Sequence, residues 1–110
     1  MNRSVPVFTA GEIAETTKGS IVRGSNDSIF KGLSADSRNI EKGNLFVPLV
    51  GENYDGHDFI EMAVKGGAAG VIIQRGKSEK FELDIPVIVV DDTLKSLGDI
   101  ASFWRRRFDA

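Results

Sequence analysis

Two short runs of β-branched residues constrain the fold of this chain more than any other feature. Residues 70–74 (GVIIQ) and 87–90 (VIVV) have the length of β-strands and show no alternation of apolar and polar positions. Such runs are typical of strands that are covered on both faces, as in parallel sheets. Because helical segments alternate with them, we expect right-handed crossover connections. The sequence therefore predicts an α/β fold with a mixed, mostly parallel sheet flanked by helices.

The first helix is well marked at both ends. Thr9 can cap its start, Glu12 completes a capping box, and Phe8 can pack on Ile13 as a hydrophobic staple. We expect this helix to run to about Lys18 and to stop at Gly19. Shorter strands are expected at residues 21–22, 33–37 and 45–50.

Two further helices follow from capping residues and apolar spacing. Asp58 is expected to cap the second helix, which ends at Gly66. Its expected buried side includes Phe59, Met62 and Ala63. A carboxylate at Asp91 or Asp92 can cap the last helix. Its expected apolar face consists of Leu94, Leu97, Ala101, Trp104 and Phe108.

Length and composition bound the class of protein. The 110 residues suffice for one domain with a single core, so we expect one domain over residues 1–110. A hydrophobic content of 41% and a net charge of −2 disfavour disorder and a nucleic-acid partner. The absence of cysteine and the single histidine disfavour a zinc site. No stretch resembles a signal peptide or a membrane span, so we expect a cytoplasmic chain without membrane insertion.

Polar, turn-forming residues lie between the apolar strands, where an α/β domain builds a small-molecule site. In the first turn, Asp36 can act as a capping carboxylate paired with Arg38 or as a ligand of a bound molecule. In the second, Tyr54 can cover a planar ring, and the amide of Asn53 can pair with the edge of a base. The dipeptide at residues 55–56 is a common turn. These residues together predict a binding loop.

The sequence offers no constellation of catalytic residues. It contains no Gly-x-x-x-x-Gly-Lys-Ser/Thr phosphate loop, no Gly-x-Gly-x-x-Gly fingerprint and no histidine-rich metal motif. His57 stands beside Asp58 at an expected helix start, which favours a capping or orienting role over that of a base. We therefore expect binding rather than catalysis.

Several of these segments together resemble the N-terminal domain of the Mur ligases. The resemblance rests on Ser34-x-Asp36-Ser37-Arg38, on the Leu45-Phe46-Val47 segment, and on Asp55-Gly56-His57-Asp58-Phe59. It covers essentially the whole chain. The segment at residues 89–105 resembles the branch of the family that adds D-Ala-D-Ala.

The resemblance implies both a function and a site. It implies an N-terminal domain that recognises UDP-N-acetylmuramoyl-tripeptide within a three-domain, ATP-dependent amide ligase of peptidoglycan synthesis. ATP and magnesium would bind to the central domain of the full enzyme, which would also be a partner of this domain, while the chain alone would be inactive and need no cofactor. The implied substrate-binding residues are Ser34, Asp36, Ser37, Arg38, Asn53, Tyr54, Asp55 and Gly56.

Two alternatives remain open at this stage. One is the N-terminal domain of the branch that adds lysine or diaminopimelate, which shares the Asp-Ser-Arg and Asp-Gly motifs. The other is a non-catalytic regulatory or interaction module of similar fold.

Overall fold

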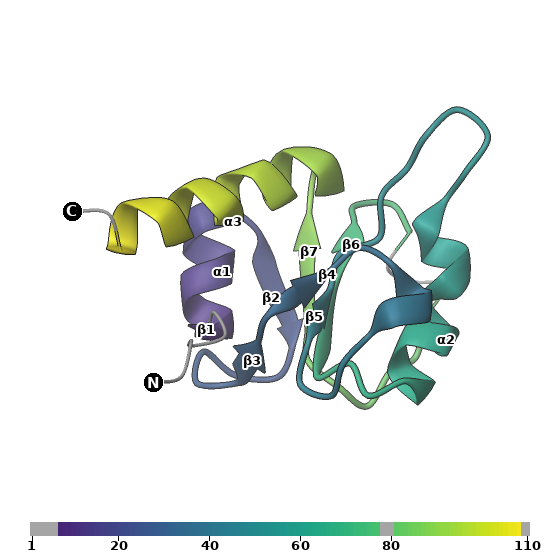
Figure 1. Ribbon diagram of the computed structural model, residues 1–110, viewed down its shortest axis with the longest axis horizontal. Coiled ribbons are helices and arrows are strands. Elements are labelled where there is room, and N and C mark those ends of the chain that lie inside the picture. The colour runs from purple at the N-terminus through teal and green to yellow at the C-terminus, as the bar shows by residue number, and fades with distance from the viewer. Residues whose placement is uncertain (1–6, 78–80, 109–110) are drawn as a thin grey trace.

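A five-stranded sheet with helices on both faces forms the body of the protein (Figure 1). The computed structural model describes residues 7–77 and 81–108. The strand order is β2-β7-β6-β5-β4, in which β2 alone runs antiparallel to its neighbour. This confirms the mixed, mostly parallel sheet. The strands of the sheet are β2 (Ser20–Arg23), β4 (Leu33–Ser34), β5 (Leu45–Phe46), β6 (Gly70–Gln74) and β7 (Val87–Val90).

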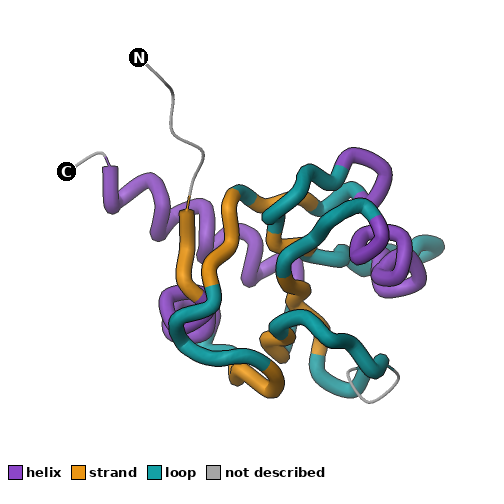
Figure 2. Tube along the Cα trace, turned by 90° about the horizontal axis from the view of Figure 1, so that it is seen from below, coloured by secondary structure: helices purple, strands orange, loops and turns teal. Residues whose placement is uncertain are grey.

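The two β-branched runs form the centre of this sheet, because β6 pairs with β7 in parallel from Val71↔Val87 to Gln74↔Val90. Alternate side chains enter two separate cores. Ile72 and Ile88 pack towards helices α1 (Ala10–Thr17) and α3 (Thr93–Phe108). Ile73 and Val89 pack instead with residues of α2 (Ile60–Lys65). Figure 2 shows the same three layers, with α1 and α3 on one side of the strands and α2 on the other.

A two-stranded antiparallel ribbon, β1 (Val7–Thr9) with β3 (Ile29–Lys31), was not expected from the sequence. Each of its strands has only three residues, too few for a periodic pattern. Phe8 and Phe30 face each other across it and are both fully buried in the core beside α1 and α3. Tertiary packing of these two rings therefore defines the ribbon.

Helix α1 begins and ends close to where the sequence predicts. Thr9 and Glu12 form both bonds of the capping box, at 3.1 and 2.9 Å. Phe8 and Ile13 lie in the same core, as the staple predicts. The helix runs to Thr17 and ends at Lys18, which adopts the left-handed conformation with φ 60° just before Gly19. A Cβ on Gly19 would lie 2.7 Å from the carbonyl oxygen of Val89. Glycine at this position therefore allows the backbone to come close to β7.

The two strands expected at residues 33–37 and 45–50 are shorter than predicted. Strand β4 ends at Ser34, where the chain turns into a 3-10 helix, η1 (Ser37–Asn39). Strand β5 lies between β4 and β6, and its regular pairing ends before Pro48. Because proline lacks a backbone N–H, Pro48 predicts either an edge position for its strand or the end of its pairing. The structure shows the end of pairing, and the edge position is wrong because β5 has a neighbour on each side.

The expected cap of the second helix is wrong. A 3-10 helix, η2 (Gly56–Phe59), precedes α2, and Asp55 caps it by accepting the backbone N–H of His57 at 2.9 Å. Asp58 consequently lies inside η2 and is exposed. Helix α2 starts after Phe59 without a side-chain cap and ends at Gly66 as expected.

The apolar face of α3 was only partly predicted. Asp92 caps the helix by accepting the backbone N–H of Lys95 at 3.1 Å, and Leu97 and Trp104 pack on the core as expected. Leu94, however, is 63% exposed and Ala101 is exposed. The backbone N–H of Thr93 is bonded to the Gln74 side chain, which fixes the start of the helix against β6. The buried positions of the helix are therefore Thr93, Ser96 and Ile100. The Phe108 side chain lies outside the described residues.

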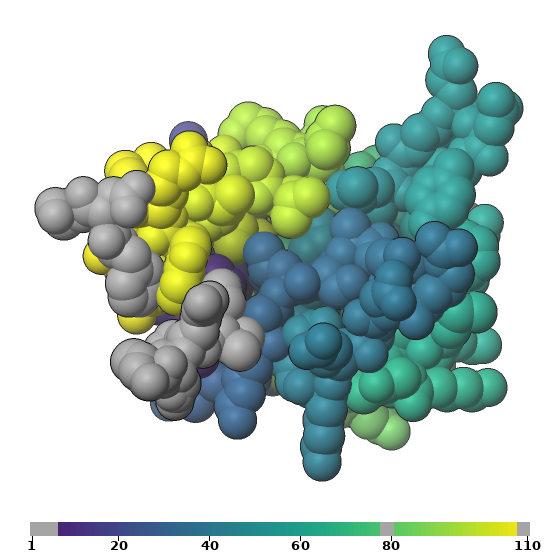
Figure 3. Space-filling model, in the orientation of Figure 1, coloured from purple at the N-terminus to yellow at the C-terminus, as the bar shows by residue number. Residues whose placement is uncertain are grey.

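The parallel strands end at one edge of the sheet, and the polar loops follow from that edge. The loop from β5 to η2 stands out from the body at the upper right of Figure 1, and Figure 3 shows its side chains projecting from the surface. In open α/β sheets, ligands bind outside the carboxyl ends of the strands. None of the described helices is long and apolar enough to cross a membrane.

Candidate functional site

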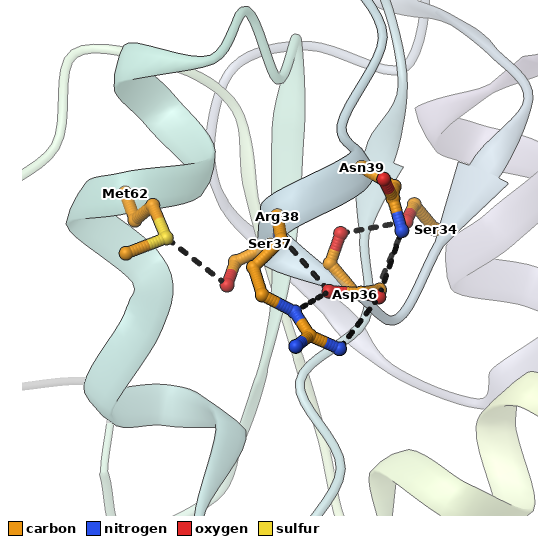
Figure 4. Close-up of polar contacts among 6 residues, drawn as sticks. All are labelled: Ser34, Asp36, Ser37, Arg38, Asn39 and Met62. Atoms are coloured by element: carbon orange, nitrogen blue, oxygen red, sulfur yellow. Dashed lines mark hydrogen bonds and ion pairs between the residues drawn. The ribbon is translucent and has the colours of Figure 1, made fainter.

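The turn after β4 is held by a network around Asp36 (Figure 4). Its carboxylate accepts the backbone N–H of Arg38 at 2.9 Å and so caps η1. Ser34 supports the turn, because its hydroxyl accepts the Asp36 N–H and donates to the Asp36 carbonyl, both at 3.1 Å. Asn39 adds a bond to the same carboxylate at 3.0 Å. The expected capping role of Asp36 is therefore confirmed.

Arg38 is oriented by the same carboxylate. Its Nε and Nη2 donate to the two oxygens of Asp36 at 3.1 and 3.2 Å, which is a two-pronged pairing. The hydrogen bond from the Arg38 side chain lowers the pKa of Asp36, and the carboxylate in turn raises the pKa of Arg38. The Arg38 side chain is nevertheless 80% exposed. The guanidinium is thus held in place while its outer face is open to solvent.

A hollow of about 480 Å³ joins this turn to the second polar loop. Tyr54 reaches it from the β5–η2 loop, 16 residues after Arg38. The Tyr54 ring stacks on Phe59 with centroids 5.8 Å apart and planes 19° apart, and Tyr54 is half exposed. The hollow is lined by Ala35, Asp36, Ser37, Arg38, Tyr54, Phe59 and Met62.

Two lining residues were assigned by the sequence to the wrong environment. Met62, expected on the buried side of α2, is 47% exposed, and Phe59 is only half-buried. The Met62 thioether accepts a hydrogen bond from the Ser37 hydroxyl at 3.5 Å (Figure 4). Spacing of three residues places Phe59 and Met62 on one side of the helical segment. That spacing is the signal that could have identified them as an apolar wall.

The other predicted site residues do not line the hollow. Ser34 lies behind the Asp36 turn, and Asn53 is exposed on the loop next to Tyr54. Asp55 and Gly56 form the base of that loop, where the Gly56 N–H donates to the Leu49 carbonyl at 2.7 Å. The structure thus brings together Asp36, Ser37, Arg38 and Tyr54 around the hollow and places the remaining four around them.

Asp55 is the centre of a second network, which sequence reasoning missed. One carboxylate oxygen accepts from Lys77 Nζ at 2.9 Å, and the other contacts His57 Nδ1 at 2.8 Å. Burial alone would raise the pKa of Asp55, but the hydrogen bonds from Lys77 and His57 outweigh it and lower the pKa to about 2. No spacing in the sequence connects Asp55 to Lys77, which lies 22 positions later.

His57 is buried within hydrogen-bonding distance of two other residues. It is 3% exposed, and both ring nitrogens have protein partners. Among the described residues, no group of three or more His, Asp or Glu side chains is arranged to hold a metal ion.

A mostly parallel sheet with an arginine turn and an aromatic loop at its carboxyl edge is typical of α/β domains that bind small molecules. Comparison with known proteins identifies the family. The sequence model described as "Mur ligase family, catalytic domain" matches residues 29–105. The chain belongs to the Mur ligase family.

Its relatives include the D-Ala-D-Ala-adding members. The chain is 38% identical over 97 residues to the UDP-N-acetylmuramoyl-tripeptide--D-alanyl-D-alanine ligase of Bacillus subtilis, covering 87% of this chain and 21% of that protein. It is 42% identical over 71 residues to the UDP-N-acetylmuramoyl-L-alanyl-D-glutamate--2,6-diaminopimelate ligase of Aquifex aeolicus, covering 64% of this chain and 14% of that protein.

Solved structures agree with the fold. The UDP-N-acetylmuramoylalanyl-D-glutamyl-2,6-diaminopimelate--D-alanyl-D-alanyl ligase of Acinetobacter baumannii superposes with a TM-score of 0.81 at 28% identity, covering 100% of this chain and 24% of that one. MurF ligase from Thermotoga maritima, solved in complex with ADP, superposes with a TM-score of 0.59 at 28% identity over 69% of this chain and 17% of that one. The chain thus spans about a quarter or less of the length of these relatives.

Proposed function

We propose that this chain is the domain of a D-Ala-D-Ala-adding Mur ligase that recognises the UDP portion of UDP-N-acetylmuramoyl-tripeptide. The observation that carries the proposal is the shared hollow, because it gathers a cation, a hydroxyl and an aromatic ring from two separate loops. A uridine diphosphate presents the complementary groups: a planar base, hydroxyls and two anionic phosphates. The relatives named above act on UDP-muramoyl peptides, as their names state.

Each predicted residue has a role in this proposal. Arg38 offers its open face to the diphosphate, since a guanidinium binds phosphate in a two-pronged geometry. Tyr54 covers the uracil ring, and the exposed amide of Asn53 beside it pairs with the base edge. Ser37 turns its hydroxyl from Met62 to the ligand.

The remaining four residues support those that touch the nucleotide. Asp36 fixes Arg38, and Ser34 fixes the Asp36 turn. Asp55 and Gly56 hold the base of the Tyr54 loop. Pre-organised contacts of this kind lower the entropy that binding costs.

We further propose that the chain contributes binding and not bond making to the full-length ligase. In this proposal ATP and magnesium bind to a central domain of the full-length ligase, against which this domain packs. The proposal is compatible with the 110 residues, which contain no Gly-x-x-x-x-Gly-Lys-Ser/Thr loop. In this proposal the enzyme works in the cytoplasm and forms an amide bond in peptidoglycan precursor synthesis.

Nuclear magnetic resonance titration tests the nucleotide site. UDP and UDP-N-acetylmuramoyl-tripeptide, added to the isotopically labelled full-length protein, are expected to shift the amide signals of residues 36–38 and 53–54 more than ADP does. Arg38→Ala is expected to weaken binding about tenfold to a hundredfold, the value of one charge-assisted hydrogen bond. Arg105→Ala, at an exposed arginine near the end of α3, is the matched control and should bind as the wild type. If both loops stay unmoved at saturating nucleotide, the site assignment is wrong.

A diaminopimelate-adding ligase is the second candidate, favoured by the 42% identity to the Aquifex aeolicus protein. The two candidates share the UDP site and differ in the group that is added. Assaying the full-length protein with D-Ala-D-Ala, diaminopimelate and lysine as acceptors separates them. Turnover with diaminopimelate or lysine alone would overturn the D-Ala-D-Ala assignment and leave the UDP site untouched.

A further inference from the structure

The buried ring of His57 joins the base of the Tyr54 loop to the end of β6. Its Nε2 accepts the backbone N–H of Gln74 at 3.0 Å, and its Nδ1 lies 2.8 Å from an oxygen of Asp55. Because Nε2 is an acceptor, the ring carries its proton on Nδ1 and donates it to Asp55. His57 is therefore held as one neutral tautomer between two elements.

Asp55 connects the His57 ring to the loop that carries Tyr54. The residue forms an antiparallel bridge with Val50, so it closes the loop that carries Tyr54. Within that loop the Gly51 N–H donates to the Tyr54 carbonyl at 2.7 Å. Residues 51–54 are all exposed, and Figure 3 shows that this loop projects from the body. The anchorage at its base therefore has a large share in setting the position of Tyr54.

Lys77 also holds Asp55 at the base of the loop, since its ammonium group lies 2.9 Å from the second carboxylate oxygen of Asp55. The Gln74 side chain continues the network by accepting the N–H of Thr93 at the start of α3. The loop, the turn after β6 and α3 are thus connected through hydrogen bonds that centre on Asp55 and His57.

We propose that His57 is a positioning residue, which fixes Tyr54 beside the hollow by linking Asp55 to β6. The consequence for nucleotide binding rests on the proposed function, whereas the consequence for the loop does not. A histidine that only satisfied the buried Gln74 N–H would affect overall stability without selecting the Tyr54 loop.

Three substitutions separate the two bonds of the ring. His57→Phe keeps a ring of similar shape and removes both bonds. His57→Asn keeps a donor near Asp55 but loses the acceptor for Gln74, and His57→Gln keeps that acceptor but loses the donor. Because the link needs both bonds, all three variants are expected to release the loop. Asp99→Asn, which removes a partly exposed carboxylate paired with Lys95 on α3, is the matched control.

Amide hydrogen exchange on the 110-residue chain measures the release without any ligand. We expect the Gly51 amide to exchange at least tenfold faster in the His57 variants, while the amides of Ile72 and Ile88 keep their wild-type rates. Asp99→Asn should leave Gly51 unchanged. If His57→Phe does not fold, the Asn and Gln variants decide the matter. A wild-type rate at Gly51 in the folded variants, or an equal acceleration at Gly51, Ile72 and Ile88, overturns the proposal.

Nucleotide binding by the full-length protein tests whether His57 acts through Tyr54. We expect His57→Phe and Tyr54→Ala each to weaken UDP binding about tenfold, and the double variant to bind no more weakly than Tyr54→Ala alone. Losses that add in the double variant overturn the proposal. If the wild-type protein binds no uridine nucleotide, the proposed function fails, and the exchange rate of Gly51 still decides the role of His57.

Discussion

Gly56→Ala is the most direct test of the loop geometry. A Cβ at this position would lie 2.8 Å from the Leu49 nitrogen, 3.0 Å from the Leu49 carbonyl oxygen and 3.0 Å from the Pro48 Cα. All three neighbours are backbone atoms, so no flexible side chain can move aside. The bond from the Gly56 N–H to the Leu49 carbonyl, at 2.7 Å, must lengthen or break.

The magnitude follows from these contacts. Overpacking of this kind costs about 1–3 kcal/mol, and a lost backbone hydrogen bond costs about 1 kcal/mol more. The lower conformational entropy of alanine in the unfolded chain offsets about 0.5–1 kcal/mol of this loss of stability. We therefore expect Gly56→Ala to lower the free energy of unfolding by about 1–3.5 kcal/mol. It should also weaken nucleotide binding, because the base of the Tyr54 loop moves.

Gly98→Ala is the matched control. Gly98 lies inside α3, and a Cβ there would meet nothing within 4 Å. The same chemical change should therefore raise the free energy of unfolding by about 1 kcal/mol through helix propensity. The two changes are expected to have opposite signs and to differ by about 2–4.5 kcal/mol.

Urea denaturation followed by circular dichroism measures both changes. With a slope of about 2 kcal/mol per molar urea, the midpoint should fall by about 0.5–2 M in Gly56→Ala and rise by about 0.5 M in Gly98→Ala. A Gly56→Ala protein within about 0.5 kcal/mol of the wild type would refute the reasoning, since that is the usual effect of an unconstrained surface change.

Three further predictions concern the C-terminal end of α1, the core and the Asp55 network. Lys18→Gly should raise the free energy of unfolding by about 1 kcal/mol, because Lys18 has φ 60°; an unfolding midpoint at or below that of the wild type would contradict this. Gly70→Ala should lower the free energy of unfolding by more than about 2 kcal/mol, since its Cβ would meet the Phe30 ring. Adding Phe30→Leu to the same chain should recover part of that loss, and strictly additive effects of the two substitutions would argue against the contact. The lowered pKa of Asp55 predicts about 2 kcal/mol of stability that is fully present above its ordinary pKa and is lost as the pH falls from about 4 to about 2. Lys77→Met should reduce this dependence in acid titrations monitored by urea denaturation, and an unchanged profile would exclude the ion pair as its source.

Local signals in the sequence were sufficient for most of the framework. The β-branched runs predicted β6 and β7 to the residue, and the capping box predicted the start of α1. Both signals depend only on residues within a few positions of each other. The ribbon of β1 and β3 was missed because its stability depends on Phe8 meeting Phe30 across 22 positions.

Four of the eight residues that the sequence proposed for the site line the hollow, and its apolar wall was not predicted. The Asp36 turn is local, so its capping role could be seen in the sequence. That Tyr54 meets the same hollow as Arg38, and that Met62 forms its wall, depends on how β4, β5 and α2 are placed around the sheet edge. The motifs indicated a nucleotide site by resemblance to the family, and the geometry distinguished the residues around the hollow from those that support them.

The sequence by itself determined the alternation of strands and helices, the two polar turns and the family to which the chain belongs. Periodicity, capping and turn formation act over a few residues, and motifs are read directly from their order. Only the tertiary structure decided that Lys18 rather than Gly19 adopts the left-handed conformation, that Asp55 rather than Asp58 caps the segment before α2, and that His57 is buried between Asp55 and β6. These outcomes depend on which distant atoms come within contact distance, and that follows from the packing of the whole sheet.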